Sequence, residues 1–136
     1  MPILYFDFCI IYFMSKKILI IEDEEDILKM YKLRLEKEGY EVNTAKNGAW
    51  GIKLAIEQKF DVIIMDIVMP AMNGCQAIKK LRIENKIFVP IIVVSNSAQD
   101  ADIEYAKKCG ANSYLIKSQI TPTELVKEIK NLLLNS

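Results

Sequence analysis

The stretch "FDVIIMDIVMP", Phe60 to Pro70, decides the fold. Its apolar run is short, continuous and rich in Ile and Val, which is typical of a strand buried on both faces of a parallel sheet. Asp66 interrupts this run. Because a carboxylate beside a hydrophobic core costs free energy unless it is solvated, paired or metal-bound, the stretch predicts a central strand and raises the question of what Asp66 does.

Apolar strands and helical patterns alternate five times from Lys16 onward. The helix after Asn47, through about Lys59, carries Ile52, Ala55 and Ile56 on the side that we expect to face inward. Five such units predict an α/β fold, a doubly wound, mostly parallel five-stranded sheet with five helices in three layers. The predicted strands span 16–21, 40–45, 61–66, 91–95 and 112–117, and the weakly alternating second one suits an edge.

The length and charge of the chain limit its partners. At 136 residues it is expected to form one domain, and its 18 basic and 18 acidic residues cancel, so direct binding to nucleic acid is not expected. Residues 1–14, "MPILYFDFCIIYFM", are too short to cross a bilayer, which takes about 20 apolar residues. We interpret 1–14 as an apolar extension of uncertain status, or else an extra edge strand or docking arm, ahead of a domain at 15–136.

The chain has no histidine and three cysteines, Cys9, Cys75 and Cys109. The missing histidine excludes a histidine base, a histidine metal site and a phosphohistidine within this sequence. The cysteines are odd in number and far apart, which predicts small buried side chains without a disulfide. This usage suits a reducing cytoplasm, and a membrane location is not expected.

Polar side chains stand where four of the predicted strands end. Glu22 and Asp23 follow the first strand, and the other ends carry Asp66, Ser95 and Lys117. Each has an ordinary explanation alone, such as an acid in a first helical turn or a serine bonded to the backbone. Because ligands of open α/β sheets bind at the carboxyl ends of the strands, we expect the five side chains to share one crevice.

The chemistry of this set favours phosphoryl transfer. Three carboxylates at one place repel one another, and a hard divalent cation such as Mg²⁺ relieves that repulsion. The sequence therefore suggests that Asp66 is the acceptor, with Lys117 and Ser95 holding the oxygens of the transferred group.

Four motifs carry a resemblance to a known family: "ILIIEDEED", "DVIIMDIVMPAMNG", "PIIVVS" and "GANSYLIK". In this order and spacing, from Lys16 to the C-terminus, the sequence closely resembles the receiver domain of bacterial two-component response regulators. The resemblance implies a flavodoxin-like fold with strand order 2-1-3-4-5. It also implies that Asp66 accepts a phosphoryl group from the phosphohistidine of a sensor histidine kinase or of a histidine phosphotransfer protein.

The resemblance also implies roles for the other site residues. Glu22 and Asp23 would hold Mg²⁺ together with Asp66 and the backbone carbonyl of Val68. Ser95 would be the switch hydroxyl, Lys117 the phosphate partner, and Tyr114 the switch aromatic. For Tyr114, packing under the last helix stays open as an alternative. Phosphorylation would change the surface of the fourth helix, the fifth strand and the last helix, where an unknown downstream protein binds.

Alternatives to this interpretation remain. A degenerate receiver could act as a phosphorylation-independent docking module. A flavodoxin would need a Ser/Thr/Gly-rich loop after the first strand, and an Asp-nucleophile phosphatase usually needs a second acid where Val68 stands. Ser118 follows Lys117 where the family usually has proline, which puts the geometry of that loop in question. We expect a single-domain response regulator, a phosphoacceptor signalling domain rather than an enzyme.

Overall fold

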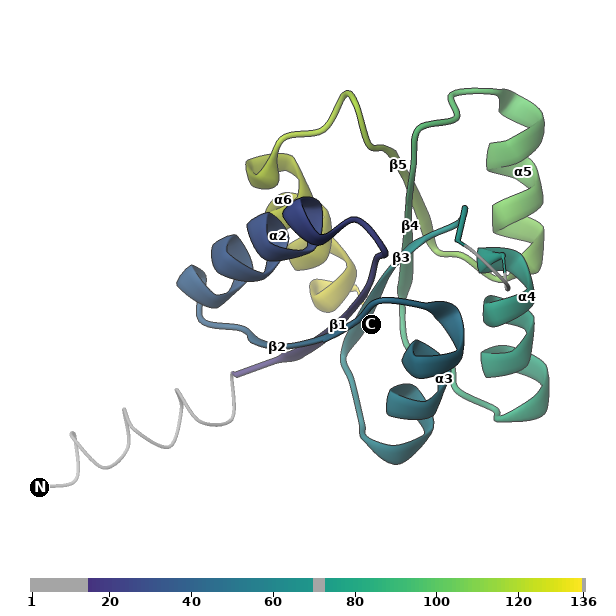
Figure 1. Ribbon diagram of the computed structural model, residues 1–136, viewed down its shortest axis with the longest axis horizontal. Coiled ribbons are helices and arrows are strands. Elements are labelled where there is room, and N and C mark those ends of the chain that lie inside the picture. The colour runs from purple at the N-terminus through teal and green to yellow at the C-terminus, as the bar shows by residue number, and fades with distance from the viewer. Residues whose placement is uncertain (1–14, 70–72, 136) are drawn as a thin grey trace, which may run out of the picture.

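Five parallel strands form the centre of the computed structural model, which describes residues 15–69 and 73–135 (Figure 1). Their order is β2-β1-β3-β4-β5, as predicted. The most apolar runs of the chain form the three central strands, which are buried on both faces. The strands are β1 (Lys17–Ile21), β2 (Glu41–Ala45), β3 (Val62–Asp66), β4 (Ile91–Ser95) and β5 (Ser113–Ile116).

A helix follows each strand. Asn47 caps α3 by accepting the Trp50 backbone N–H, and Thr121 caps α6 by accepting that of Glu124. Within the described residues, no helix is both long and apolar enough to cross a membrane. The helices are α2 (Glu25–Lys37), α3 (Gly48–Glu57), α4 (Gly74–Lys79), which continues into a π-helical turn η1 (Lys80–Glu84), α5 (Asp100–Cys109) and α6 (Pro122–Leu134).

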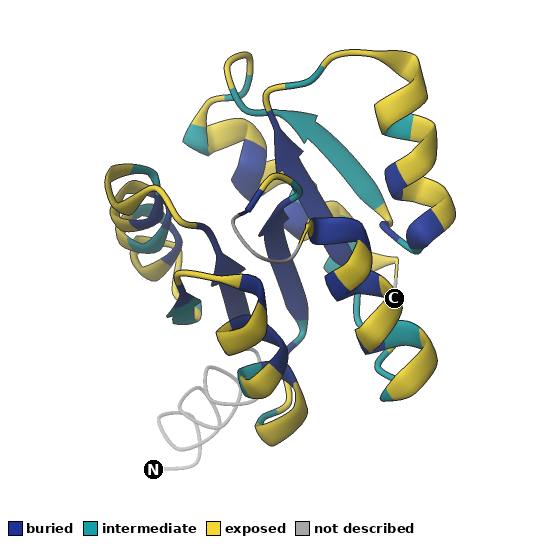
Figure 2. Cartoon of the chain, turned by 45° about the vertical axis from the view of Figure 1, so that its right-hand side comes forward, coloured by how far each residue is buried: buried dark blue, intermediate teal, exposed yellow. Residues whose placement is uncertain are grey.

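The helices cover both faces of the sheet, so the fold has three layers (Figure 1). Successive strand residues point to opposite faces, which divides the core in two. Ile18 and Ile20 pack with α2 and α6, whereas Leu19 and Ile21 pack with α3, α4 and α5. Figure 2 shows the buried central strands between half-exposed helices, with β5 less buried at its edge.

One predicted core residue is not in the core. Ile52 and Ala55 are buried in α3 as expected, but Ile56 is 53% exposed, so the prediction that it faces inward was wrong. The buried stripe of α3, formed by Gly48, Gly51, Ile52 and Ala55, is centred near the direction of Gly48. At 3.6 residues per turn, Ile56 is turned about 80° from that direction, which places it at the margin of the stripe. It lines an open groove that also includes Phe60 and Phe88.

The prediction that the cysteines form no disulfide was also wrong. Cys75 at the start of α4 and Cys109 at the end of α5 are joined by a disulfide, with their Cα atoms 5.6 Å apart. They are 34 residues apart in the sequence, and only the packing of α4 against α5 brings them together. Cys9 and the rest of segment 1–14 lie outside the described residues, so the interpretation of that segment stays a prediction.

The Arg82 guanidinium connects η1 to the end of α5. It is half-buried and donates to four oxygens, and burial lowers its pKa. The acceptors are the carbonyls of Gly110 (2.9 Å), Ile87 (2.9 Å) and Val89 (2.7 Å) and the side-chain oxygen of Asn112 (2.8 Å). These bonds fix the turn that leads from α5 into β5.

We expect Arg82→Ala to lower the free energy of unfolding by about 2–4 kcal/mol, because part-buried carbonyls lose a charged donor. Urea denaturation followed by circular dichroism measures the change. The control is Arg34→Ala, since Arg34 donates to Glu38 and Thr123 at the surface and should cost less than about 1 kcal/mol. Equal losses for the two variants would contradict the role assigned to Arg82.

Candidate functional site

The side chains predicted from the strand ends converge at the carboxyl edge of the sheet. Asp66 and Ser95 are the last residues of β3 and β4, and Glu22 directly follows β1. These three are the buried polar residues of the described chain. Lys117 directly follows β5, and its backbone N–H donates to the Ser95 carbonyl at 2.7 Å. The parallel register thus delivers groups from four strands to one place.

Lys117 lies at the centre of this group. Its ammonium donates to a Glu22 carboxylate oxygen at 2.8 Å and to an Asp66 carboxylate oxygen at 2.9 Å, with the lysine side chain only 7% exposed. A third bond goes to Glu24 at 3.2 Å, whose side chain is largely exposed. One cation therefore partly balances several acids in a poorly hydrated setting, where each charge interacts strongly.

The three predicted metal ligands lie together. Glu22, Asp23 and Asp66 each offer a carboxylate oxygen, and these oxygens lie within 4.8 Å of one another. Asp23 is exposed, whereas the other two are buried, so the cluster opens to solvent on one side. Oxygen donors with an open side fit Mg²⁺, which takes an octahedral set of oxygens and usually keeps several waters.

The electrostatics of the buried acids reflect this crowding. Burial raises the pKa of Glu22 to about 7, and the nearby Asp66 charge adds to the rise, while the bond from Lys117 opposes it. Burial alone would lower the pKa of Lys117, but its hydrogen bonds to the Glu22 and Asp66 carboxylates raise it above its ordinary value. Lys117 therefore stays protonated at neutral pH, and a further positive charge would be favourable here.

The Asp66 carboxylate is held by both of its oxygens. One accepts the Lys117 ammonium, and the other accepts the Val68 backbone N–H at 3.0 Å. Asp66 also lines an open cavity of about 360 Å³, together with Asp23, Val68, Ser95 and Lys117. A small anionic group entering this cavity would meet the aspartate, the lysine and the serine at once.

Ser97 connects the two predicted switch residues, and sequence reasoning missed it. Its backbone N–H donates to the Ser95 hydroxyl oxygen at 3.2 Å, and its carbonyl accepts the Tyr114 hydroxyl at 2.9 Å. The only sequence signal was a second serine two residues after Ser95, a common hydrogen-bonding pattern for serine. A smaller cavity of about 220 Å³ lies beside this chain of bonds, lined by Ile67, Tyr105 and Tyr114 among others.

Glu24 and the peptide bond after Lys117 also belong to the site. Glu24, which sequence reasoning did not single out, supplies the third acid in contact with Lys117. The peptide bond between Lys117 and Ser118 is trans. Ser118 therefore replaces the proline that is usual in the family without preventing the Lys117 ammonium from contacting Glu22 and Asp66.

The comparisons with known proteins agree with this geometry. Residues 18–130 match the model of the family described as "Response regulator receiver domain". The chain is 33% identical over 123 residues to the alkaline phosphatase synthesis transcriptional regulatory protein PhoP of Bacillus subtilis, covering 90% of this chain and 50% of that protein. It is 36% identical over 116 residues to response regulator SaeR of Staphylococcus aureus, covering 85% and 50%. The chain thus spans about half the length of these curated relatives.

Solved structures give the same result. A CheY-like receiver domain protein from Methanospirillum hungatei superposes with a TM-score of 0.82 at 30% identity, covering 89% of this chain and 95% of that one. The chemotaxis protein CheY4 of Vibrio cholerae gives 0.82 at 32% identity, covering 88% and 99%. The receiver domain of the Pseudomonas aeruginosa sensor histidine kinase PA1611, solved with magnesium coordinated in its active-site cleft, gives 0.79 at 29% identity, covering 88% and 98%.

Proposed function

Because the chain belongs to the family of response regulator receiver domains of two-component systems, we propose that Asp66 is its phosphoryl acceptor. The donor is a phosphohistidine on a sensor histidine kinase or a histidine phosphotransfer protein. One observation carries the proposal: the Asp66 carboxylate faces an open cavity, with the Lys117 ammonium 2.9 Å away. This arrangement pairs a nucleophile with a fixed cation that can bind the incoming group.

The transfer uses the residues of the cavity directly. A carboxylate oxygen of Asp66 bonds to phosphorus while the bond from phosphorus to the donor imidazole nitrogen breaks, and the imidazole leaves with that electron pair. The Lys117 ammonium moves its contact from the carboxylate to a phosphoryl oxygen. The Ser95 hydroxyl donates to another phosphoryl oxygen.

Glu22, Asp23, Asp66 and the Val68 carbonyl would hold Mg²⁺ at this site. The clustered carboxylate oxygens of the three acids support this assignment, as does the magnesium in the cleft of the PA1611 receiver domain. When bound, Mg²⁺ neutralises negative charge on the phosphoryl oxygens and on the acids around them. The buried acids position that charge beside the acceptor.

Phosphorylation then reaches the surface through Ser97. The Ser95 side chain moves toward the phosphoryl group to donate its O–H there, and this movement takes its oxygen away from the Ser97 N–H that it now accepts. The loop that carries Ser97 also holds the Tyr114 hydroxyl, so its movement frees that side chain. The surface of α5, β5 and α6 changes as a result, and a downstream protein reads this change.

The proposal is tested by labelling the protein with acetyl phosphate. Intact-mass measurements should show one added phosphoryl group in the presence of Mg²⁺, mapped to Asp66 after borohydride reduction. With EDTA we expect the initial rate to fall by about a hundredfold, the usual effect of removing one electrostatic stabiliser of a transition state. Adding excess Mg²⁺ should restore it. Equal rates with EDTA, or labelling at another residue, would contradict the proposal.

A further inference from the structure

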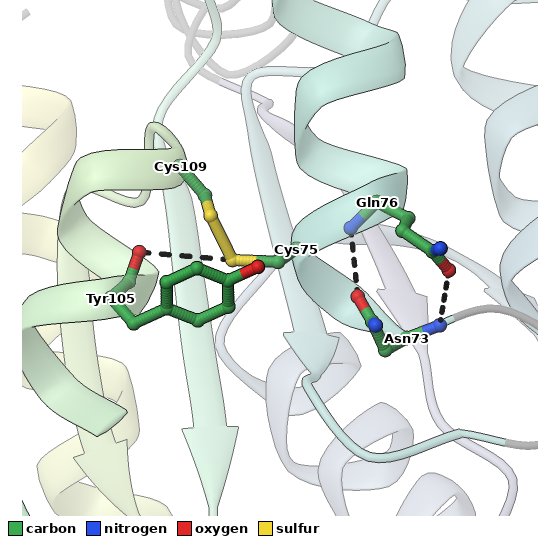
Figure 3. The surroundings of a disulfide bond; sticks show 5 residues. All are labelled: Asn73, Cys75, Gln76, Tyr105 and Cys109. Atoms are coloured by element: carbon green, nitrogen blue, oxygen red, sulfur yellow. Dashed lines mark hydrogen bonds between the residues drawn. A yellow bond between two sulfur atoms is a disulfide. The ribbon is translucent and has the colours of Figure 1, made fainter. Parts of the chain in front are cut away.

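The disulfide between Cys75 and Cys109 joins two helices, α4 and α5, each of which follows a loop that lines the cavity of the proposed phosphorylation site. Cys75 is the second residue of α4, and Cys109 is the last residue of α5 (Figure 3). The sequence predicted no such bond, and the proposed phosphoryl transfer does not use it. Its position between the two helices points to a role in how the site communicates with the surface.

The Cys75 end is tied to the phosphoacceptor loop. The Gly74 backbone N–H donates to the Ile67 carbonyl at 2.7 Å, and Ile67 is the residue after Asp66. A Cβ atom at Gly74 would lie 2.6 Å from the Ile67 Cα, so this contact is too close for any side chain. The reciprocal bonds between Asn73 and Gln76 fix the first turn of α4 (Figure 3).

The Cys109 end belongs to the helix that follows the switch loop. Ser97, which binds both the Ser95 hydroxyl oxygen and the Tyr114 hydroxyl, lies three residues before α5 begins. A movement of this loop can carry the start of α5 with it, and a packed helix then shifts or pivots as a rigid unit against its neighbours. The disulfide anchors the far end of α5 to α4 and restricts that movement.

We propose that Cys75 and Cys109 form a redox-controlled tether between α4 and α5. In the disulfide form, the tether opposes the response of the α5, β5 and α6 surface to phosphorylation. In the dithiol form, α5 is released and the surface responds more readily. This inference rests on the proposed function of Asp66, since it concerns how strongly the phosphoryl group at that residue changes the surface.

The chemistry is thiol–disulfide exchange with a dithiol reductant. Both cysteines are buried, and Cys109 is the less buried of the two, so we assign the attack of the reductant thiolate to the Cys109 sulfur, and the Cys75 sulfur leaves as a thiolate. The second thiol of the reductant then resolves the mixed disulfide. Two electrons and two protons pass to the cysteine pair, and the reductant becomes a disulfide. A disulfide oxidant reverses the reaction.

Both redox forms are expected to stay folded. The Cys75 sulfur lies 3.7 Å from the Tyr105 carbonyl oxygen, and Figure 3 marks this contact with a dashed line. A disulfide sulfur has no proton to donate, but the reduced Cys75 thiol can donate to this carbonyl, so reduction leaves a polar partner in place. The bonds from Arg82 to the Gly110 carbonyl hold the turn after α5 in both forms. Reduction therefore removes one covalent restraint and leaves the turn fixed.

The test compares the full chain in its two redox forms. Intact mass, two hydrogens lower for the disulfide, defines each form. Beryllofluoride with Mg²⁺ mimics the phosphoryl group, and amide NMR shifts of residues 96–117 follow the response. We expect the disulfide form to need at least about fivefold more beryllofluoride for half-maximal change, the lower range of allosteric coupling. Equal half-saturation in the two forms would overturn the tether.

Three variants serve as controls. Cys75→Ser and, as an independent check on folding, Cys109→Ser should respond like the reduced protein whatever the redox conditions. Cys9→Ser should keep the full difference between the two forms, because only the pair at 75 and 109 forms the tether; loss of the difference would overturn it. Labelling of Asp66 by acetyl phosphate is measured alongside. No labelling in either form would overturn the proposed function itself, whereas normal labelling with equal responses would overturn the tether alone.

Discussion

Replacing Asp66 with asparagine is expected to abolish phosphoryl labelling by acetyl phosphate and Mg²⁺ while leaving the fold intact. The amide of asparagine has nearly the shape of the carboxylate but lacks its charge and its nucleophilic oxygen. The side-chain oxygen of the introduced asparagine can still accept the Val68 backbone N–H, as that of Asp66 does at 3.0 Å. The sheet should therefore form as before, because Asp66 ends β3 and its backbone pairing does not depend on the side chain.

Intact mass after incubation with acetyl phosphate measures the labelling, and circular dichroism verifies the fold. The matched control is Asp61→Asn. Asp61 directly precedes β3, at the opposite edge of the sheet, and its carboxylate accepts the Lys17 backbone N–H at 2.8 Å. This variant should be labelled like the unmodified protein. Labelling of Asp66→Asn at the normal level would refute the assignment of the acceptor.

The fold could be predicted because its signals are local. Continuous runs such as "VIIM" in β3 indicate buried parallel strands, and the alternation of strands and helices leaves few topologies. The predicted five-stranded sheet and its order are confirmed. The convergence of Glu22, Asp23, Asp66 and Lys117 follows from the same rule, because carboxyl ends of parallel strands meet at one edge. Their chemical roles stay predictions until labelling is measured.

Features that depend on packing between helices were not visible in the sequence. The pairing of Cys75 with Cys109 depends on how α4 lies against α5, and no spacing rule indicates it. The hydrogen bonds of Arg82 could not be predicted either. In the sequence Arg82 is one basic residue of a helix, and only the folded structure brings the Gly110 carbonyl, in the turn after α5, within reach of its guanidinium. The prediction for Ile56 failed for a different reason: its spacing of four from the buried Ile52 suggests the inward face, but it lies at the margin of the buried stripe of α3.

Lys117→Met is expected to lower the free energy of unfolding of the metal-free protein by about 3–5 kcal/mol at neutral pH. Methionine keeps an unbranched apolar stem but removes the ammonium, so Glu22 and Asp66 remain buried without the cation that now lies within 2.9 Å of both. Urea denaturation in EDTA measures the loss. Mg²⁺ should restore a larger share of stability in this variant than in the unmodified protein, since it would then be the counter-charge of these acids.

The matched control is Lys46→Met, because Lys46 pairs with Glu25 on the exposed surface and its loss should change stability little.

The pH dependence of stability adds a second test of the charge cluster around Lys117. Burial already raises the pKa of Glu22 to about 7, and removing Lys117 raises it further. Above the unfolded pKa of 4.5, the folded variant then holds a proton that the unfolded chain has lost, so its stability falls as pH rises. Up to about pH 7 the unmodified protein also keeps this proton on Glu22, so the two stabilities fall in parallel; the gap between variant and unmodified protein should therefore widen only above about pH 7. A gap that is constant with pH, or a loss no larger than that of Lys46→Met, would contradict a buried charge cluster balanced by Lys117.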